Sequence, residues 1–170
     1  MDFGPTRKLE LSIMAEASFT WIVDSPLGGL ALTANADALT ALDWTFLAAN
    51  EGAPGHPILR QAVNELAAYF SDSRHVFTVP TTQPGSEFEQ AVWREMCEIP
   101  SGETRSYGDL ASATGRPARA VGGACGANAI PIIVPCHRVV GADGRMVGYS
   151  GKGGIETKTW LLRHENAMLI

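Results

Sequence analysis

Short runs of alternating apolar and polar residues dominate the first half of the chain. Residues 19–23, 30–33 and 39–42 each alternate in this way, and Gly or Ser-Pro turns separate them. This period of two predicts three strands of a small antiparallel sheet. Over residues 56–70 the spacing becomes helical, with an apolar stripe that includes Tyr69. One amphipathic helix is therefore expected to lie across the sheet.

From residue 86 onward the pattern is helical. A first apolar stripe stops at Pro100. Ser106 is placed to cap a short helix that Gly115 ends, and a second short helix is expected over residues 118–127. Two short helices joined by a tight, Gly-containing turn form a helix-turn-helix pattern, which many helical cores also contain.

These patterns divide the chain into three parts and predict an α/β (α+β) fold. The expected boundaries are residues 1–17 for an N-terminal tail, 18–85 for a sheet-and-helix domain with its linker, and 86–170 for a helical domain. A chain of 170 residues can bury a substantial core. No stretch approaches the roughly 20 apolar residues of a membrane span, and no signal peptide is evident. A cytoplasmic protein without membrane contact is expected.

The cysteines point to chemistry rather than to crosslinks. There are three, an odd number at wide spacing, which favours a reducing compartment. Cys136 follows three apolar β-formers and Pro135, so it is expected at the end of a buried strand. His137 and Arg138 come next, and both favour the nucleophilic thiolate. A buried inert thiol is the alternative. No histidines and cysteines cluster at ligand spacing, so no metal is expected.

Charge is distributed unevenly along the sequence. The chain carries a net charge of −5, but residues 105–163 contain eight Lys/Arg and three Asp/Glu. That segment is therefore +5 and the remainder −10. A basic segment around the candidate nucleophile favours a polyanionic partner, with a chance distribution of surface charge as the alternative.

The second helix of the pair is unusually rich in glycine. It contains Gly122, Gly123 and Gly126, and a helix-interior glycine costs about 1 kcal/mol relative to alanine. Such a helix needs its backbone close to something. Tight packing in the core is one explanation, and close approach to a DNA groove is the other. Arg119, alone among small residues, favours the groove.

Several motifs in the second half resemble one family. The Pro-Cys-His-Arg-Val run around Cys136 is the most specific of them. Together they resemble the O6-alkylguanine–DNA alkyltransferases, also called methylated-DNA–protein-cysteine methyltransferases, over roughly residues 18–167. The residues that carry the resemblance are Tyr107, the Arg119-Ala-Val-Gly run, Asn128, residues 135–139, residues 149–151, Lys158, Trp160, His164 and Glu165.

The resemblance implies a chemistry and a set of roles. An alkyl group would pass from O6-alkylguanine in duplex DNA to Cys136, once per molecule and with no cofactor, and O4-alkylthymine is a second candidate substrate. His137 would act as the base through a water, Glu165 would orient His137, and Asn128 would hold the turn beside the cysteine. The guanine pocket would be lined by Tyr149, Ser150, Gly151, Val139, Lys158 and Tyr107.

The resemblance also implies a mode of DNA binding. A monomer would bind the minor groove through the second helix of the helix-turn-helix. Arg119 would replace the extruded nucleotide in the stack, and Tyr107 would push its phosphate. Further DNA contacts are expected from Ala118, Gly122, Gly123, Arg116 and Arg138.

Three departures from the family pattern stand out. Ala129 follows Asn128 where the family commonly has proline, which predicts a looser turn. The turn between the paired helices is shorter, which weakens the role given to Tyr107. The loop after Tyr149 is longer and places Lys152 as an extra cation beside the pocket. None of these changes touches the acceptor or its relay.

Two other functional classes compete with a transferase. The first is a lesion-sensing protein of the same fold, but such relatives lack the acceptor that Cys136 represents. The second is a cysteine hydrolase using Cys136 and His137. Adjacent residues rarely present both side chains to one substrate, and papain-like or caspase-like signatures are absent.

Overall fold

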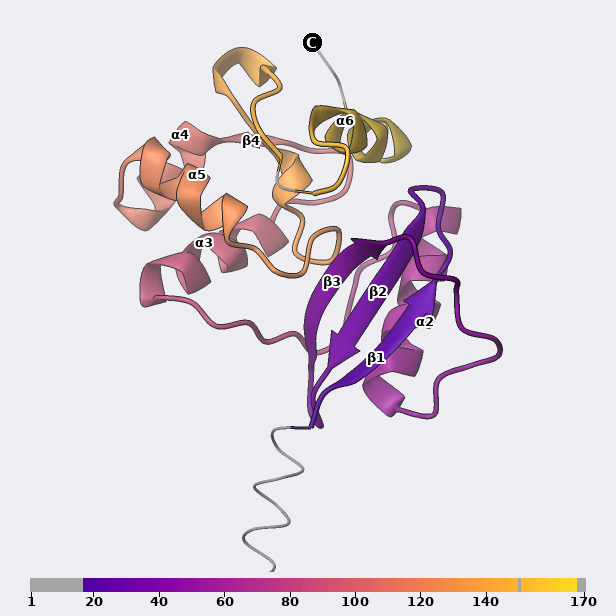
Figure 1. Cartoon of the computed structure of the whole chain (residues 1–170). Coiled ribbons are helices and arrows are strands. Elements are labelled where there is room, and N and C mark those ends of the chain that lie inside the picture. The colour runs from indigo at the N-terminus through magenta and orange to yellow at the C-terminus, as the bar shows by residue number, and fades with distance from the viewer. Residues whose placement is uncertain (1–16, 150, 168–170) are drawn as a thin grey trace, which may run out of the picture.

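A computed structural model describes residues 17–149 and 151–167 of the chain (Figure 1). The tail expected over residues 1–17 lies almost wholly outside the described residues. The division at residues 85 and 86 stays a prediction. Among the described residues, no helix has the length and apolar character needed to cross a membrane.

The predicted sheet is confirmed. Strands β1 (Phe19–Val23), β2 (Gly29–Ala34) and β3 (Leu39–Thr45) pair antiparallel in the order β1-β2-β3. Alternate residues of β2 are buried, as a strand with one face on the core requires. Helix α2 (Pro57–Ser71) packs against that face (Figure 1). Its buried positions recur at helical spacing and include Tyr69, which is fully buried.

The helical part begins with two capped helices. Helix α3 (Glu87–Cys97) starts at a reciprocal capping box between Ser86 and Glu89. Helix α4 (Tyr107–Thr114) follows the short strand β4 (Arg105–Ser106) and starts at a second such box, between Ser106 and Asp109. Gly115 ends α4 at φ 70°, a left-handed conformation that glycine adopts without steric cost. Helix α5 (Ala118–Gly126) comes next, so the predicted helix pair is confirmed.

The strand predicted before Cys136 is wrong. Residues 131–134 form a turn, in which Ile132 has φ 73° and the Val134 N–H donates to the Ile130 carbonyl at 2.9 Å. Cys136 instead opens the 3₁₀ turn η1 (Cys136–Arg138). The β-forming side chains are buried as expected, but the backbone closes into a turn because it is bonded locally. Asn128 completes that closure from its side chain.

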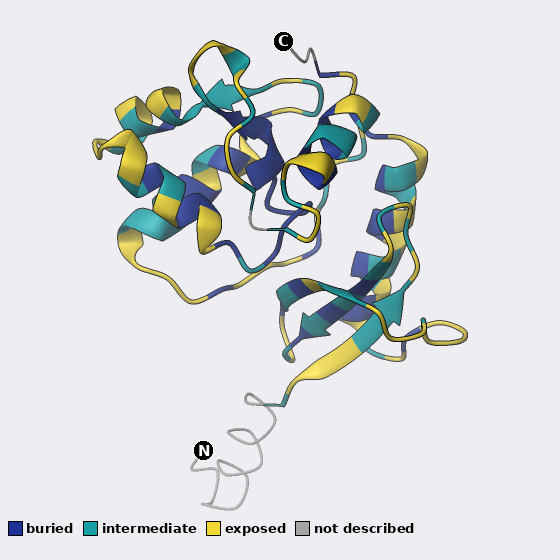
Figure 2. Ribbon diagram, turned by 45° about the horizontal axis from the view of Figure 1, so that its top comes forward, coloured by how far each residue is buried: buried dark blue, intermediate teal, exposed yellow. Residues whose placement is uncertain are grey.

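The rest of the chain returns over this turn. Strand β5 (Val139–Val140) pairs in parallel with β4, the turn η2 (Ala142–Gly144) follows, and helix α6 (Ile155–His164) ends the described fold. One continuous hydrophobic core runs from the sheet into the helical part. The ribbon around η1 lies in its buried interior (Figure 2). A backbone bond from the Leu42 N–H to the Ala129 carbonyl, 2.9 Å, links β3 to the segment after α5.

Candidate active site

Cys136 lies on the wall of a small cavity. The thiol belongs to the first residue of η1 and is 4% exposed. The cavity has a volume of about 160 Å³ and opens between α5 and the segment before α6. Its lining residues are Tyr107, Gly122, Cys125, Gly126, Cys136, Gly148 and Tyr149. A reactive sulfur on the wall of a pocket of this size can meet a small group that enters it.

The Cys136 side chain is a neutral thiol. Burial raises the pKa of Cys136, and the hydrogen bond from Asn128 and the charge of Lys158 offset only part of that effect. The neighbours were expected to lower the thiol pKa, and the His137 backbone does so, but burial outweighs this effect. A thiolate therefore forms only where another group takes the proton.

His137, the next residue, is paired with Glu165. Its Nε2 lies 2.8 Å from Glu165 Oε1, and both side chains are fully buried. Burial lowers the pKa of His137, and Glu165 works against that effect. Because Glu165 is a carboxylate and can only accept, Nε2 carries the hydrogen and Nδ1 keeps its lone pair. Nδ1 has no hydrogen-bond partner among the described residues, so it is available as a base.

Glu165 stays ionised although it is buried. Desolvation works to raise its pKa, but His137 and then Arg138 outweigh that effect and lower it to about 2. The carboxylate therefore serves as a fixed negative group behind His137.

Arg138 points inward, which makes its assignment to DNA contact wrong. Its Nε donates to Glu165 Oε2 at 3.0 Å and its Nη2 to Oε1 at 2.9 Å. Nη1 donates to the Ile99 carbonyl at 2.6 Å, and the residue is 8% exposed. A buried carboxylate needs a counter-charge, and this guanidinium supplies it in a bidentate geometry.

Tyr69 also binds Glu165, and the sequence did not reveal this contact. Its hydroxyl donates to Glu165 Oε1 at 2.7 Å across 96 positions of sequence. The helical pattern of residues 56–70 identified Tyr69 only as a core residue. No local signal distinguishes a buried tyrosine with a distant acceptor from one that only packs.

Asn128 lies where the prediction put it, and Gln83 holds it there. Asn128 Nδ2 donates to the Val134 carbonyl at 2.9 Å. Gln83 Nε2 donates to Asn128 Oδ1 at 3.1 Å, and Gln83 Oε1 accepts the Ala129 N–H at 2.6 Å. A proline at position 129 has no N–H to give. The turn was expected to be looser without proline, but the side-chain amide of Gln83, in the segment before α3, holds it through this bond.

Lys158 and Val139 do not line the cavity beside Cys136. Lys158 is fully buried, and its three ammonium hydrogens are matched by the carbonyls of Val139, Val147 and Gly148 at 2.5, 3.2 and 3.3 Å. The Val139 side chain is fully buried in the core. Both residues therefore support the pocket: Lys158 ties the Val147-Gly148 backbone, next to Tyr149, to α6.

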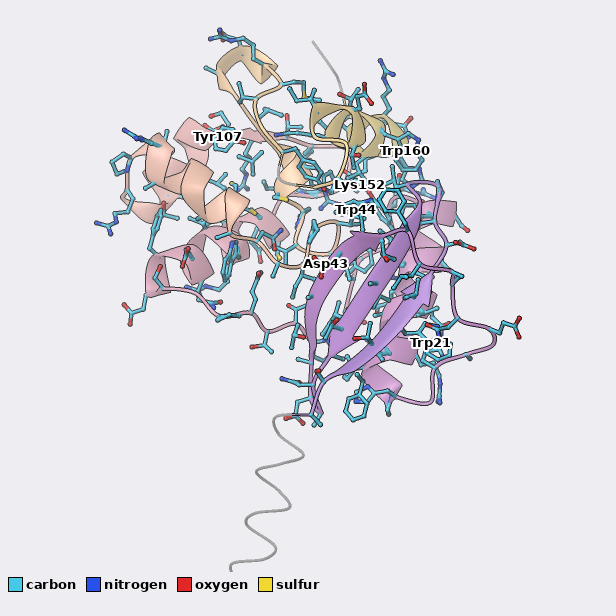
Figure 3. The ribbon with its side chains drawn as sticks, viewed as in Figure 1. Trp21, Asp43, Trp44, Tyr107, Lys152 and Trp160 are labelled. Atoms are coloured by element: carbon cyan, nitrogen blue, oxygen red, sulfur yellow. The ribbon has the colours of Figure 1, made fainter. Side chains whose placement is uncertain are left out.

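The predicted pocket loop is only partly in contact with the cavity. Tyr149 lines it, and its hydroxyl is buried with no partner among the described residues. Ser150 lies outside the described residues. Gly151 lines a neighbouring cavity of about 180 Å³ with Trp44, whose ring meets Tyr149 edge-on. Lys152, labelled in Figure 3, lies over the Phe46 ring at 3.3 Å and is not among the residues that line the cavity.

One face of α5, called the bare face below, is formed by Ala118, Arg119, Gly122 and Gly123. Ala118, Arg119 and Gly123 are exposed, and Gly122 is half-buried. A Cβ built on Gly122 or Gly123 would meet nothing within 4 Å, so packing inside the protein does not require these glycines. The opposite face of α5 is the one that packs, with the Trp93 indole donating to the Ala124 carbonyl at 2.8 Å.

The remaining candidates lie around these groups. Arg116 is exposed and lies over the Phe88 ring at 5.4 Å. Tyr107 is half-buried on the cavity wall, and its hydroxyl donates to the Val147 carbonyl at 3.3 Å. Cys125 lines the same cavity as Cys136, whereas Cys97 is exposed. Among the residues that the structure describes, no group of three His, Cys, Asp or Glu side chains is placed to hold a metal.

Two family models match the chain over nearly all of its described length. The 6-O-methylguanine DNA methyltransferase ribonuclease-like domain matches residues 19–83, and the DNA binding domain of the same family matches residues 87–167. The chain belongs to the 6-O-methylguanine DNA methyltransferase family. The match to the DNA binding domain contains η1, the helix pair α4 and α5, and α6.

Individual relatives agree with this assignment. The methylated-DNA–protein-cysteine methyltransferase of Mycolicibacterium paratuberculosis is 45% identical over 157 residues, which cover 86% of this chain and 94% of that protein. The constitutive methyltransferase of that name from Bacillus subtilis is 40% identical over 152 residues, covering 84% and 92%. The similarity therefore extends over nearly the whole length of these methyltransferases and is not limited to one motif.

Solved structures of this family share the fold. Mycobacterium tuberculosis O6-methylguanine methyltransferase superposes with a TM-score of 0.76 at 41% identity, covering 88% of this chain and 93% of that one. The M. tuberculosis OGT structure in complex with DNA gives a TM-score of 0.75 at 42% identity, covering 87% and 94%. The predicted α/β class is confirmed by this agreement.

The lowered pKa of Glu165 predicts a specific response to acid. Glu165 has a folded-state pKa of about 2 against an ordinary value of 4.5. Its contribution to stability is therefore present above pH 4.5 and is lost as the pH falls from there toward 2. Urea unfolding followed at several pH values should show the loss. Glu165→Gln should be less stable at neutral pH, because it leaves Arg138 buried without a charged partner, and should respond less to acid over that window.

The control is the exposed Glu51→Gln, which should follow the unchanged protein at every pH. An unaltered acid response in Glu165→Gln would contradict the depressed pKa.

Proposed function

We propose that the chain repairs DNA by moving an alkyl group from O6-alkylguanine to Cys136, once per molecule. The observation that carries this proposal is the thiol on the wall of a small cavity beside a buried His137–Glu165 pair. Family membership supplies the reaction class, and the relatives that share most of this chain are named for it.

The proposed chemistry is a displacement at carbon. The Cys136 sulfur attacks the alkyl carbon, the new S–C bond forms, and the bond from that carbon to guanine O6 breaks. The thiol proton passes through a water to His137 Nδ1, and Glu165 stabilises the imidazolium that results. The product is a thioether, and among the described residues no group around Cys136 is arranged to hydrolyse it. Each molecule therefore reacts once.

Tyr149 is the proposed acid for the leaving group. Its hydroxyl is buried near Cys136, and burial raises its pKa well above the ordinary range. The phenol is therefore protonated at neutral pH and available to donate to guanine N3 as negative charge develops on the base. Lys158 acts indirectly in this proposal, because it fixes the backbone just before Tyr149.

The bare face of α5 is the proposed DNA-binding surface. A target atom on a base edge is out of reach inside the duplex, so the nucleotide has to leave the stack, at a cost of a few kcal/mol. Arg119 is exposed near the start of α5 and is proposed to fill the gap from the minor groove. The glycines on this face let the backbone approach the groove walls.

Of the two roles that the resemblance implied for Tyr107, we assign it the one on the pocket wall. It lies half-buried on the cavity wall and burial raises its pKa to about 12. A wall residue of the pocket fits this position better than a group pushing on the phosphate backbone. The proposed working state is a cytoplasmic monomer, since one chain supplies every group named here.

The acceptor assignment predicts the outcome of a mass measurement. Mixing the protein with a duplex that contains O6-methylguanine should add one methyl group permanently, and peptide mapping should place it on Cys136. Cys136→Ala should gain none and still bind DNA, while the exposed-thiol control Cys97→Ala should react normally. A duplex with O4-methylthymine tests the second candidate substrate.

Other results in this experiment point to the rival classes. Binding without any mass gain by the unchanged protein indicates a lesion sensor, and turnover indicates a hydrolase. Methyl uptake by Cys136→Ala, at Cys97 or Cys125, rules out Cys136 as the acceptor.

The arginine on α5 predicts a split between two substrates. Arg119→Ala should slow repair of duplex DNA far more than reaction with free O6-benzylguanine, because the arginine assists extrusion and not alkyl transfer. Single-turnover rates with both substrates provide the measurement. Arg116→Ala is the matched control: it should weaken DNA binding but leave both rates unchanged when the duplex is at a saturating concentration. Equal losses on both substrates would place Arg119 in the structural framework instead.

The bare glycine face predicts a trade between stability and DNA affinity. Gly123→Ala should stabilise the fold by up to about 1 kcal/mol, because the helix gains propensity and the new Cβ meets nothing inside the protein. The same methyl group should weaken duplex binding. Gly108→Ala on α4 is the matched control and should leave duplex affinity unchanged. Urea unfolding and fluorescence anisotropy measure the two effects, and unchanged affinity in Gly123→Ala would exclude close approach of the DNA at this position.

A further inference from the structure

The Glu165 carboxylate accepts hydrogen bonds from two separate elements. His137 and Arg138 approach from η1, and Tyr69 approaches from α2, which packs against the sheet. Glu165 itself lies at the end of α6. Oε1 accepts from all three of these residues, whereas Oε2 accepts only from Arg138 among the described residues. The phenol and the imidazole therefore share one oxygen.

The Tyr69 hydroxyl stays protonated and serves as a hydrogen-bond donor to Glu165. It is fully buried, and burial together with the nearby Glu165 charge raises the pKa of its phenol far above the ordinary value. Its backbone carbonyl also lies 2.8 Å from His164 Nε2, so α2 grips two successive residues at the end of α6. The ring itself packs among aromatic neighbours, with Phe77 at a centroid distance of 5.4 Å. The hydroxyl therefore has a fixed direction toward Glu165.

We propose that Tyr69 is a positioning residue of the acceptor site, whose hydroxyl shares the negative charge of Glu165 and so keeps His137 the neutral base. This inference rests on the proposed function. A phenol O–H that bonds to Oε1 reduces the charge that this oxygen presents to the imidazole. Without it, Glu165 holds a proton on His137 more strongly, and a protonated His137 cannot accept the thiol proton.

The other charged groups around His137 do not replace this effect. Arg138 from η1 and Lys158 from α6 both oppose protonation of His137, and Glu165 from α6 favours it. Arg138 spreads its two bonds over both carboxylate oxygens, so it holds the carboxylate in place when the phenol is removed. Loss of the Tyr69 hydroxyl should therefore change the charge on Oε1 more than the position of Glu165.

The test compares Tyr69→Phe with the unchanged protein. Two quantities are followed against pH: the single-turnover rate with free O6-benzylguanine, and the titration of His137 by NMR of isotope-labelled imidazole. In Tyr69→Phe we expect the acid limb of the rate profile and the His137 midpoint to move together to higher pH, by roughly half a unit. Phe77→Leu perturbs the same aromatic cluster without touching the carboxylate, so it should lower stability and leave both midpoints in place.

A second variant guards against loss of the fold. Tyr69→3-fluorotyrosine keeps the ring and hydroxyl but donates more strongly, so both midpoints should move to lower pH. Unmoved midpoints in both Tyr69 variants, or an equal shift in Phe77→Leu, would overturn the proposal and leave Tyr69 as a packing residue. The NMR titration needs no alkyl transfer. A protein that shifts its His137 midpoint as expected but never alkylates Cys136 would therefore refute the proposed function and not the role of Tyr69.

Discussion

The ionised carboxylate of Glu165 is the constraint on which the acceptor site depends. A charge buried in a protein interior is stable only when counter-charges and donors surround it. The partners of Glu165 come from η1 and from α2, so this carboxylate connects both of them to the end of α6. Removing one partner of such a buried pair typically lowers the free energy of unfolding by about 3–5 kcal/mol. The hydrogen bonds around Glu165 therefore stabilise the fold as well as orienting His137.

The resting state of the site follows from the same burial. A thiol whose pKa is raised reacts slowly with electrophiles at large, since the thiolate is the nucleophile. In the proposed mechanism, the neutral imidazole of His137 beside Glu165 takes the thiol proton during the reaction. The proposed site therefore does not depend on a sulfur that is permanently ionised.

The sequence predicted best those features whose causes are local. The strands and the ends of α4 follow from alternation, from the Ser106 cap and from Gly115, which act within a few residues. The turn before Cys136 was missed because Ile132 adopts a positive φ against its own preference, held by bonds from Asn128 and Ile130.

Long-range pairs within the site could not be read in the same way. Arg138 looked like a surface cation because its partner Glu165 lies 27 positions away. Tyr69 and Gln83 looked like a core residue and a linker residue, since the groups they bind lie 96 and 45 positions away. The resemblance identified Cys136, His137 and Glu165, but only the folded chain shows what surrounds them.

Helix α6 carries two supports at once. Lys158, in its middle, holds the carbonyls that precede Tyr149, and Glu165 follows its last turn behind His137. The backbone beside the cavity wall and the carboxylate behind His137 are therefore held by one helix. A displacement of α6 would disturb the shape of the cavity and the partner of the imidazole at the same time.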